Sequence, residues 1–186
     1  MNLLANLFKR NIQAEPIVQK TAKEKQLIFI KESLKPLLKA EGYSTAGNKW
    51  WKVNGQFFNF FELQNFSWNS SNSVYFCFNF TTGFTSEMSS AGKPKIHNGI
   101  TYVRENYFSV TEIEYWSKAN GYHIDANTDL NRFTTRVLDD FKLLILPKLN
   151  LLTNRDAILK FYSDEFWAPR VEQSLQLGYK NVQVNP

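Results

Sequence analysis

The residues that could carry chemistry are few in this chain of 186 residues, and they lie far apart. Nucleophilic catalysis needs a nucleophile beside a base, and the single thiol is that of Cys77, flanked by two phenylalanines in a strand-like run. A cysteine in that setting is typically a small buried hydrophobe. The two histidines, His97 and His123, occur in loop-like surroundings without a cysteine cluster or a His-Glu-x-x-His spacing. The sequence therefore predicts neither a catalytic cysteine nor a zinc site.

Two pairs of carboxylates are the remaining candidates for acid–base chemistry or cation binding. Glu112 and Glu114 would share one strand face, because strand side chains alternate. The alternative, which we prefer, is a solvent-facing edge strand protected by charge. Asp139 and Asp140 fit the polar side of a helix, and no glycine-rich loop opens a helix as a phosphate site would. We expect no cofactor and no metal.

The elements that would position such residues begin with a helix. Thr21 and Glu24 form a capping box, in which hydroxyl and carboxylate satisfy backbone donors. Apolar residues then recur at helical spacing over residues 27–38, and Gly42 is a natural stop. We expect Pro36 to kink this helix, because proline lacks the N–H donor.

An Asn-Gly pair predicts a tight hairpin in the aromatic-rich stretch that follows. Asn54-Gly55 lies between two strand-like runs, and both of its residues accept the positive φ that a two-residue turn requires. That turn would place Trp51 opposite Phe58. A second reversal, a four-residue loop at 69–72, would add a further antiparallel strand.

Alternation of side chains sorts these strands into two faces. With the loop at 69–72, Gln64 lies opposite Cys77 and Glu62 opposite Asn79. One face is apolar and would form the core: Trp50, Phe57, Phe61, Leu63, Phe76, Phe78 and Phe80. The other face, which we call the mixed face, combines rings with polar side chains: Trp51, Phe58, Phe60, Glu62, Gln64, Phe66, Tyr75, Cys77 and Asn79.

The mixed face is the candidate binding site. The residues expected to contact a ligand or partner are Trp51, Phe58, Phe60, Glu62, Gln64, Tyr75 and Asn79. Rings would supply contact area, and the polar side chains would set the orientation of the bound molecule. In the alternative, a C-terminal helix covers this face and satisfies its polar groups internally, and the apolar excess favours that arrangement.

The second half of the chain predicts one more strand region and then helices. Residues 84–106 are rich in Gly, Ser, Pro and Lys, so we expect a long, mobile excursion from Met88 to Gly99. Residues 107–116 alternate as a fourth strand would, and residues 122–124 suit a short fifth. Helices are expected from Asp129 to near Pro147, after a cap at residues 153–156, and from Pro169 to Gly178.

Together these patterns predict the α+β class: an N-terminal helix, an antiparallel β-meander of four to five strands, and C-terminal helices packed on the sheet. A chain of 186 residues suits one domain with a sizeable core. We expect a flexible N-terminal arm at residues 1–19, a single domain at 20–178 and a tail at 179–186.

Several short motifs resemble a bacterial family of unknown function, number 4304 in the domain-of-unknown-function series. They are Leu34–Tyr43, Gly47–Trp50, Gln64, Trp68-Asn69-Ser70 and Val74–Asn79. Tyr43 replaces the usual Phe of the family, and Phe80-Thr81 departs from its Leu-Gly pattern. The resemblance covers residues 25–165. It implies the same architecture and a bacterial source, and it brings no assigned activity.

Bulk composition limits the location and the partners. The longest apolar runs fall well short of the ~20 residues that a membrane helix needs, so we expect no membrane partner. The N-terminus does not read as an export signal, and a lone Cys77 suits a reducing compartment, which predicts a cytoplasmic location. The net charge of +5 is compatible with nucleic-acid binding, although solvated helix faces explain the scattered lysines better.

Three functions follow from these observations. The first is a non-catalytic binding domain that recognises an unknown protein partner or small ligand. The second is single-stranded nucleic-acid binding through the aromatic side chains of the sheet. The third is an enzyme that uses the acidic residues of the sheet, namely Glu112 with Glu114, or Glu62.

Overall fold

The computed structural model describes residues 20–109, 115–116 and 121–178. The expected arm at 1–19 and tail at 179–186 lie outside the described residues, as do Glu112 and Glu114. No helix within the described ranges is long and apolar enough to cross a membrane.

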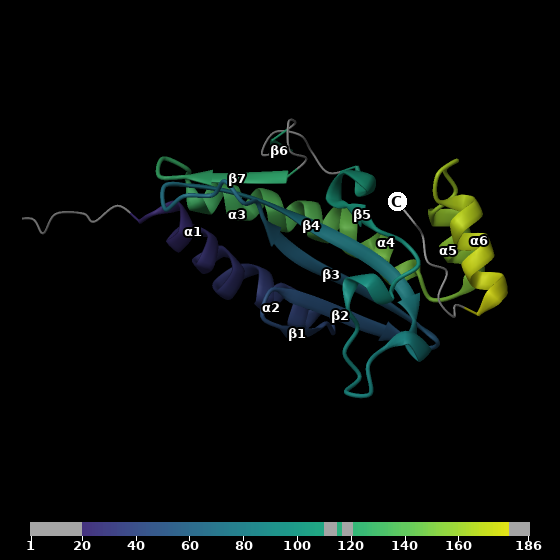
Figure 1. Ribbon diagram of the computed structural model, residues 1–186. Helices are drawn as coiled ribbons and strands as arrows, with labels where there is room; N and C mark the ends of the chain where they lie inside the picture. Colours follow the sequence, from purple (N-terminus) through teal and green to yellow (C-terminus); the bar gives the residue numbers. More distant parts are fainter. Residues whose placement is uncertain (1–19, 110–114, 117–120, 179–186) are drawn as a thin grey trace, which may run out of the picture.

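Two helical rods lie on one face of a twisted antiparallel sheet (Figure 1). The N-terminal rod consists of α1 (Ala22–Ile28), the π-helical η1 (Phe29–Leu34) and α2 (Lys35–Ala40). The C-terminal rod consists of α3 (Leu130–Asp139), the π-helical η6 (Asp140–Ile145) and α4 (Leu146–Leu151). Two further helices, α5 (Arg155–Phe161) and α6 (Ala168–Leu177), lie beyond the end of the second rod. The helix boundaries at the Thr21 capping box, at Gly42 and at Gly178 are confirmed.

Both rods contain a proline, and in both the hydrogen-bonding pattern changes from α-helical to π-helical just before it. In each, a π-helical turn comes directly before an α-helix whose first turn contains the proline, Pro36 in α2 and Pro147 in α4. The residue before each proline still donates within its rod, Lys35 N–H to the Ile30 carbonyl and Leu146 N–H to the Phe141 carbonyl, so the π-helical turn carries the hydrogen bonding up to the proline. The prediction that the second helix ends near Pro147 was therefore wrong, since the rod continues to Leu151.

The sheet has the strand order β1-β2-β3-β4-β7-β6, and β5 also pairs with β4. Its strands are β1 (Ser44–Ala46), β2 (Lys49–Asn54), β3 (Phe57–Asn65), β4 (Ser73–Phe84), β5 (Val103–Arg104), β6 (Tyr115–Trp116) and β7 (Gly121–Asp125). The predicted fold class, with its antiparallel sheet between an N-terminal helix and C-terminal helices, is confirmed. The sheet has more strands than expected, because β1 and β5 are too short to give an alternating pattern.

The two predicted reversals fared differently. The loop at 69–72 has the expected register, with Gln64 opposite Cys77. At the first hairpin, Asn54 belongs to β2 and pairs with Phe57, so the turn is Gly55-Gln56. Trp51 consequently lies opposite Phe60 rather than Phe58. A shift by two residues keeps every side chain on its face, because strand side chains have a period of two.

The predicted core face is buried against the two rods. All seven of its residues are at most 8% exposed: Trp50, Phe57, Phe61, Leu63, Phe76, Phe78 and Phe80. The ring of Phe141 in η6 lies 5.0 Å from that of Phe78 and 5.7 Å from that of Phe61, while Phe29 in η1 lies 6.3 Å from Phe76. Helices from both ends of the chain thus share one aromatic core, which accounts for much of the phenylalanine content.

The segment between β4 and β7 differs most from expectation. Residues 84–106 form a long excursion between β4 and β5, as expected, and it contains the 3₁₀ turns η2 (Thr85–Glu87) and η3 (Ile96–Asn98) and ends in the strand β5. The predicted fourth strand begins instead with the 3₁₀ turn η4 (Glu105–Phe108), which ends at Ser109 with φ 62°. Only residues 115–116 of that prediction are strand among the described residues, whereas the short fifth strand is confirmed as β7.

Candidate functional site

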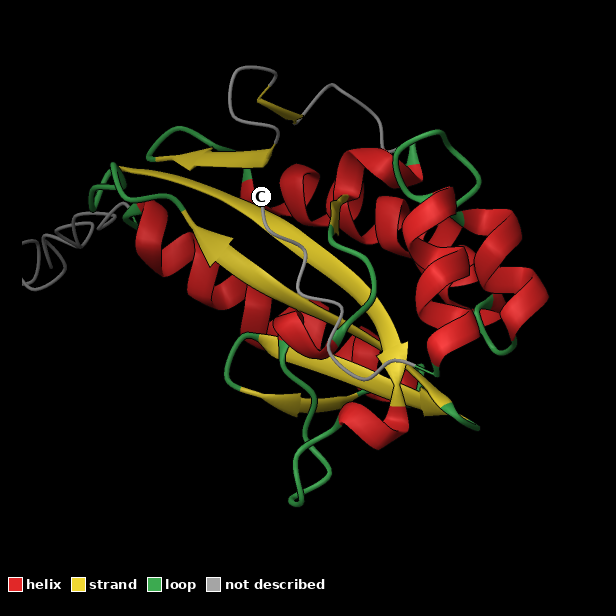
Figure 2. Cartoon of the chain, turned by 45° about the vertical axis from the view of Figure 1, so that its right-hand side comes forward, coloured by secondary structure: helices red, strands yellow, loops and turns green. Residues whose placement is uncertain are grey.

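A strap formed by residues 85–101 covers one half of the mixed face (Figure 2). Its ends are fixed to the sheet by the Thr85 N–H, which donates to the Gln56 carbonyl at 2.9 Å, and by the Ile100 N–H, which donates to Thr82 at 2.8 Å. Met88 and Ile96 of the strap pack on a small apolar cluster beneath it. The mixed face is therefore covered in part, but by this strap and not by the expected C-terminal helix.

The cluster beneath the strap consists of Trp51, Phe58 and Phe60. None of the three is more than 9% exposed, so they form a second, smaller core. These residues were predicted to contact a ligand or partner; they are buried beneath the strap, and that role stays a prediction. Phe60→Ala would report on packing and not on recognition.

Two glycines let the strap lie directly on β4. A Cβ atom at Gly83 would lie 2.6 Å from both the Asn98 carbonyl oxygen and the Phe58 ring. A Cβ atom at Gly99 would lie 1.5 Å from the Thr81 hydroxyl oxygen. Glycine inside a strand marks such a close backbone approach, so Gly83 is the sequence signal by which the cover could have been found.

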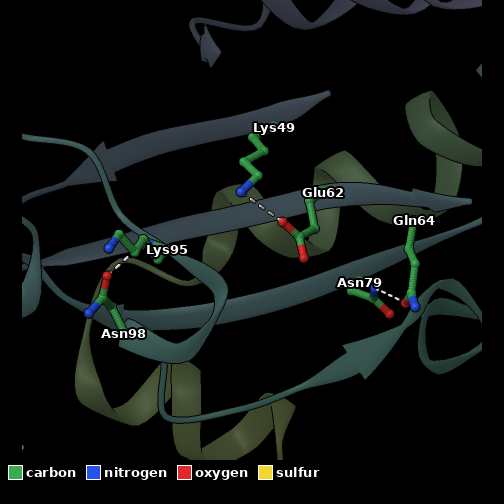
Figure 3. A network of polar contacts seen from close by, with 6 residues as sticks. All are labelled: Lys49, Glu62, Gln64, Asn79, Lys95 and Asn98. Carbon is green, nitrogen blue, oxygen red and sulfur yellow. Dashed lines mark hydrogen bonds and ion pairs between the residues drawn. The ribbon is translucent and has the colours of Figure 1, made fainter. Parts of the chain in front are cut away.

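The other half of the mixed face, which we call the open half, carries the polar cluster (Figure 3). Asn79 is 1% exposed and donates from Nδ2 to Gln64 Oε1 at 2.7 Å, while Gln64 itself is exposed. Glu62 forms an ion pair of 3.4 Å with Lys49 on the neighbouring strand. Asn79 thus fixes the side-chain carbonyl oxygen of the exposed Gln64.

Stacked rings border this polar cluster. The Phe66 and Trp68 rings lie 4.9 Å apart at an interplanar angle of 8°, and the Trp68 side chain is 56% exposed. The Arg104 guanidinium lies 5.8 Å from the centre of the Phe66 ring. The Phe66 and Trp68 rings are held by this stack and by the Arg104 guanidinium, so they lose little conformational entropy when a partner binds, which favours recognition.

A second stack lies across the sheet, on the strands that continue this face. The Tyr75 and His123 rings lie 4.1 Å apart at an interplanar angle of 8°. His123 Nε2 also shares a hydrogen bond of 2.9 Å with the Ser73 hydroxyl. His123 therefore belongs to β7 and contacts the predicted site, although the sequence suggested a loop residue.

Of the seven predicted site residues, the structure leaves Glu62, Gln64 and Tyr75 accessible and uses Asn79 as their support. Sequence reasoning missed Arg104 and His123. Arg104 reaches this face because β5 pairs Arg104 with Asn79, and a strand of two residues gives no periodicity from which that pairing could be read.

The thiol and the buried acid near this face are unsuited to catalysis. Burial raises the pKa of the Cys77 thiol to about 12, which removes the thiolate that a nucleophile needs. Glu105 is fully buried, and burial raises its pKa to about 8. A carboxyl group with no exposed surface cannot reach a substrate. Within the described ranges there is no group of three or more side chains that could hold a metal ion.

Comparison of the chain with models of protein families, with curated proteins and with solved structures gives no match. The function must therefore be argued from the site itself.

Proposed function

We propose that this protein is a non-catalytic binding domain that holds a protein partner on the open half of the mixed face. One observation carries the proposal: Tyr75 and Arg104 share a sheet face with the exposed Gln64, and Trp68 stacks on Phe66 of the same face. Tryptophan, tyrosine and arginine dominate the energetics of protein interfaces, especially where they are held in place before binding.

The charges of the open half favour a protein over a nucleic acid. Lys49 and Glu62 on adjacent strands present both signs of charge within one ion pair. A carboxylate at this position repels phosphate, whereas the rim of a protein interface commonly carries both signs. Asn79 fixes the Gln64 carbonyl oxygen, and the Gln64 amide can donate hydrogen bonds to a partner.

Site-specific photocrosslinking in the source organism tests the proposal. A benzophenone amino acid at Gln64 is expected to capture one discrete protein partner. The matched control position is Leu143, which is 71% exposed and lies on the C-terminal rod behind the sheet. Equal capture at both positions, or none at Gln64, would contradict the proposal.

Purified components then test the contribution of single side chains. Removing a central tryptophan from an interface typically costs more than about 2 kcal/mol, so Trp68→Ala is expected to weaken the captured partner's binding by tenfold or more. Leu143→Ala should leave the affinity unchanged. Equal affinity of the Trp68→Ala and wild-type proteins would place the interface elsewhere.

Single-stranded nucleic-acid binding is the second candidate, and the stacked pairs Phe66–Trp68 and Tyr75–His123 favour it. Bases stack on such rings, and Arg104 could contact the backbone. This function predicts a mobility shift with single-stranded RNA or DNA that falls steeply as salt rises. No shift at low salt would eliminate it.

We further propose a cytoplasmic location and membership of the bacterial family number 4304. The support for the location is a single, buried free thiol at Cys77, and the support for the family is the set of motifs from Leu34 to Asn79. Fractionation of cells into membrane, periplasmic and cytoplasmic pools tests the location, and recovery outside the cytoplasmic pool would contradict it.

A further inference from the structure

A second surface feature, separate from the open half, is a cleft of about 370 Å³ between the end of the strap and α6. The strap side contributes Ile96, His97, Gly99, Ile100, Thr101 and Tyr102, and the helix side contributes Phe166, Trp167 and Arg170. Pockets that enclose small molecules have volumes of about 300–1,000 Å³, so this cleft can hold a ligand of one or two rings. Tyr102, which lines the cleft, directly precedes β5 and lies two positions before Arg104 of the open half.

Flat apolar surfaces form the walls of the cleft. Phe166 is 56% exposed and Tyr102 is 47% exposed, although both are large rings that burial would stabilise. The Phe166 and Trp167 rings lie 4.9 Å apart and almost perpendicular, at 88°. An added ring between such walls gains both apolar burial and ring–ring contact, which selects a planar aromatic ligand over an aliphatic one.

The charge of the cleft is positive. The Arg170 guanidinium lies 3.8 Å from the centre of the Phe166 ring, and its Nη1 donates to the Phe166 carbonyl. Among the described residues that line the cleft, none is acidic, so no carboxylate neutralises this arginine there. A guanidinium that stacks on a ring keeps further N–H groups in a planar fork, which matches the two oxygens of a carboxylate.

We infer that this cleft binds a small aromatic carboxylate. Its ring lies between Tyr102 and the rings of Phe166 and Trp167, and its carboxylate accepts hydrogen bonds from Arg170. This site is independent of the protein partner proposed for the open half, and either can exist without the other.

Calorimetric titration of the full chain with three probes tests the inference. The probes are indole-3-acetate, its neutral amide indole-3-acetamide, and cyclohexylacetate, an anion without an aromatic ring. Hydrogen bonds to charged groups are the strong ones, so we expect indole-3-acetate to bind about tenfold tighter than the amide. The ring walls should likewise make it bind tighter than cyclohexylacetate.

Variants assign the binding to this cleft. Arg170→Gln should abolish the preference for the acid over the amide, while Phe166→Ala should weaken both aromatic probes. Arg155→Gln, at an exposed position that begins α5, is the matched control and should behave as wild type. Circular dichroism establishes that each variant is folded.

Three results would overturn the inference. The first is an absence of saturable binding by the aromatic acid, and the second is equal affinity for the acid and its amide. The third is binding that appears only in a variant ending at Gly178, because the cleft would then belong to residues 179–186 of the chain itself.

Discussion

The carboxylate of Glu105 accepts a hydrogen bond from the backbone N–H of Phe78, with 2.9 Å between Oε2 and N. This contact lies where β4 exchanges one partner for another, because Phe76 still pairs with β7 and Asn79 already pairs with β5. A side chain thus satisfies a backbone donor for which neither neighbouring strand provides an acceptor. The other carboxylate oxygen, Oε1, is buried without a hydrogen-bond partner among the described residues.

Glu105 should make stability depend on pH. Burial raises its pKa in the folded protein to about 8, above the ordinary value of 4.5 that applies to the unfolded chain. Between these values the folded state binds a proton that the unfolded state has lost, so the free energy of unfolding falls as the pH rises from 4.5 to about 8. The Glu105→Gln variant mimics the protonated form and should be more stable than wild type at pH 8 by at least about 1 kcal/mol.

Urea unfolding of both proteins at several pH values between 5 and 8 measures this effect. The advantage of Glu105→Gln should grow with pH across that range and vanish towards pH 5. Glu172→Gln, an exposed substitution on α6, serves as the control and should show no such trend. A constant difference between Glu105→Gln and wild type would show that the carboxyl group does not titrate between the two states.

Gly99→Ala should detach the strap from the sheet. The added methyl group would overlap the Thr81 side chain, and overpacking of this kind costs about 1–3 kcal/mol. We expect lower stability in urea and faster proteolysis within residues 85–101, together with exposure of the Trp51 indole. Ser90→Ala, at an exposed position of the same strap, should leave both measurements unchanged. Unaltered proteolysis of Gly99→Ala would mean that the close approach does not hold the strap.

The sequence predicted which side chains share a face but not what covers each face. Alternation of side chains is a local property of each strand, so the buried face that contains Trp50 and Phe80 could be predicted without the exact hairpin register. The observed register at Asn54 differs from the predicted one by two residues, which leaves every side chain on its predicted face. The strap could not be read in this way. Its position depends on the contact of Gly99 with Thr81, which only the folded chain brings together.

The same distinction explains the partial success with the candidate site. Glu62, Gln64 and Asn79 were placed together correctly, because their register follows from one loop length. Arg104 lies on this face because the two-residue strand β5 pairs with the middle of β4. A strand this short has no periodic pattern from which the pairing could be predicted. The two helical rods likewise continue past Pro36 and Pro147 through π-helical turns, which helix propensities do not anticipate.

Lys25→Met should destabilise the contact between α1 and the loop that follows β7. Lys25 is 9% exposed, and its ammonium group donates to the carbonyl oxygens of Ala126 at 2.6 Å and Thr128 at 2.7 Å. Methionine keeps the apolar stem but removes the charged donor, and losing such bonds at a buried site costs about 1–3 kcal/mol. Chemical denaturation measures the loss, with the exposed Lys23→Met as control. Equal stability of the two variants would show that solvent satisfies these carbonyl groups instead.

A buried hydrogen-bonded chain should fix how the C-terminal rod docks on the sheet. Asn59 Nδ2 donates to the Leu149 carbonyl, and the Thr82 hydroxyl donates to Asn59 Oδ1, each at 2.8 Å. Asn59→Leu removes the hydrogen-bond partner of both the Leu149 carbonyl and the Thr82 hydroxyl, which should lower the free energy of unfolding by about 1–3 kcal/mol. Thr82→Val removes the donor to the Asn59 side-chain carbonyl and should have a cost of the same size. The double variant removes the Asn59–Thr82 pair together, so its cost should be smaller than the sum of the single costs. Additive costs in this double-mutant cycle would mean that the Asn59 and Thr82 side chains are not coupled.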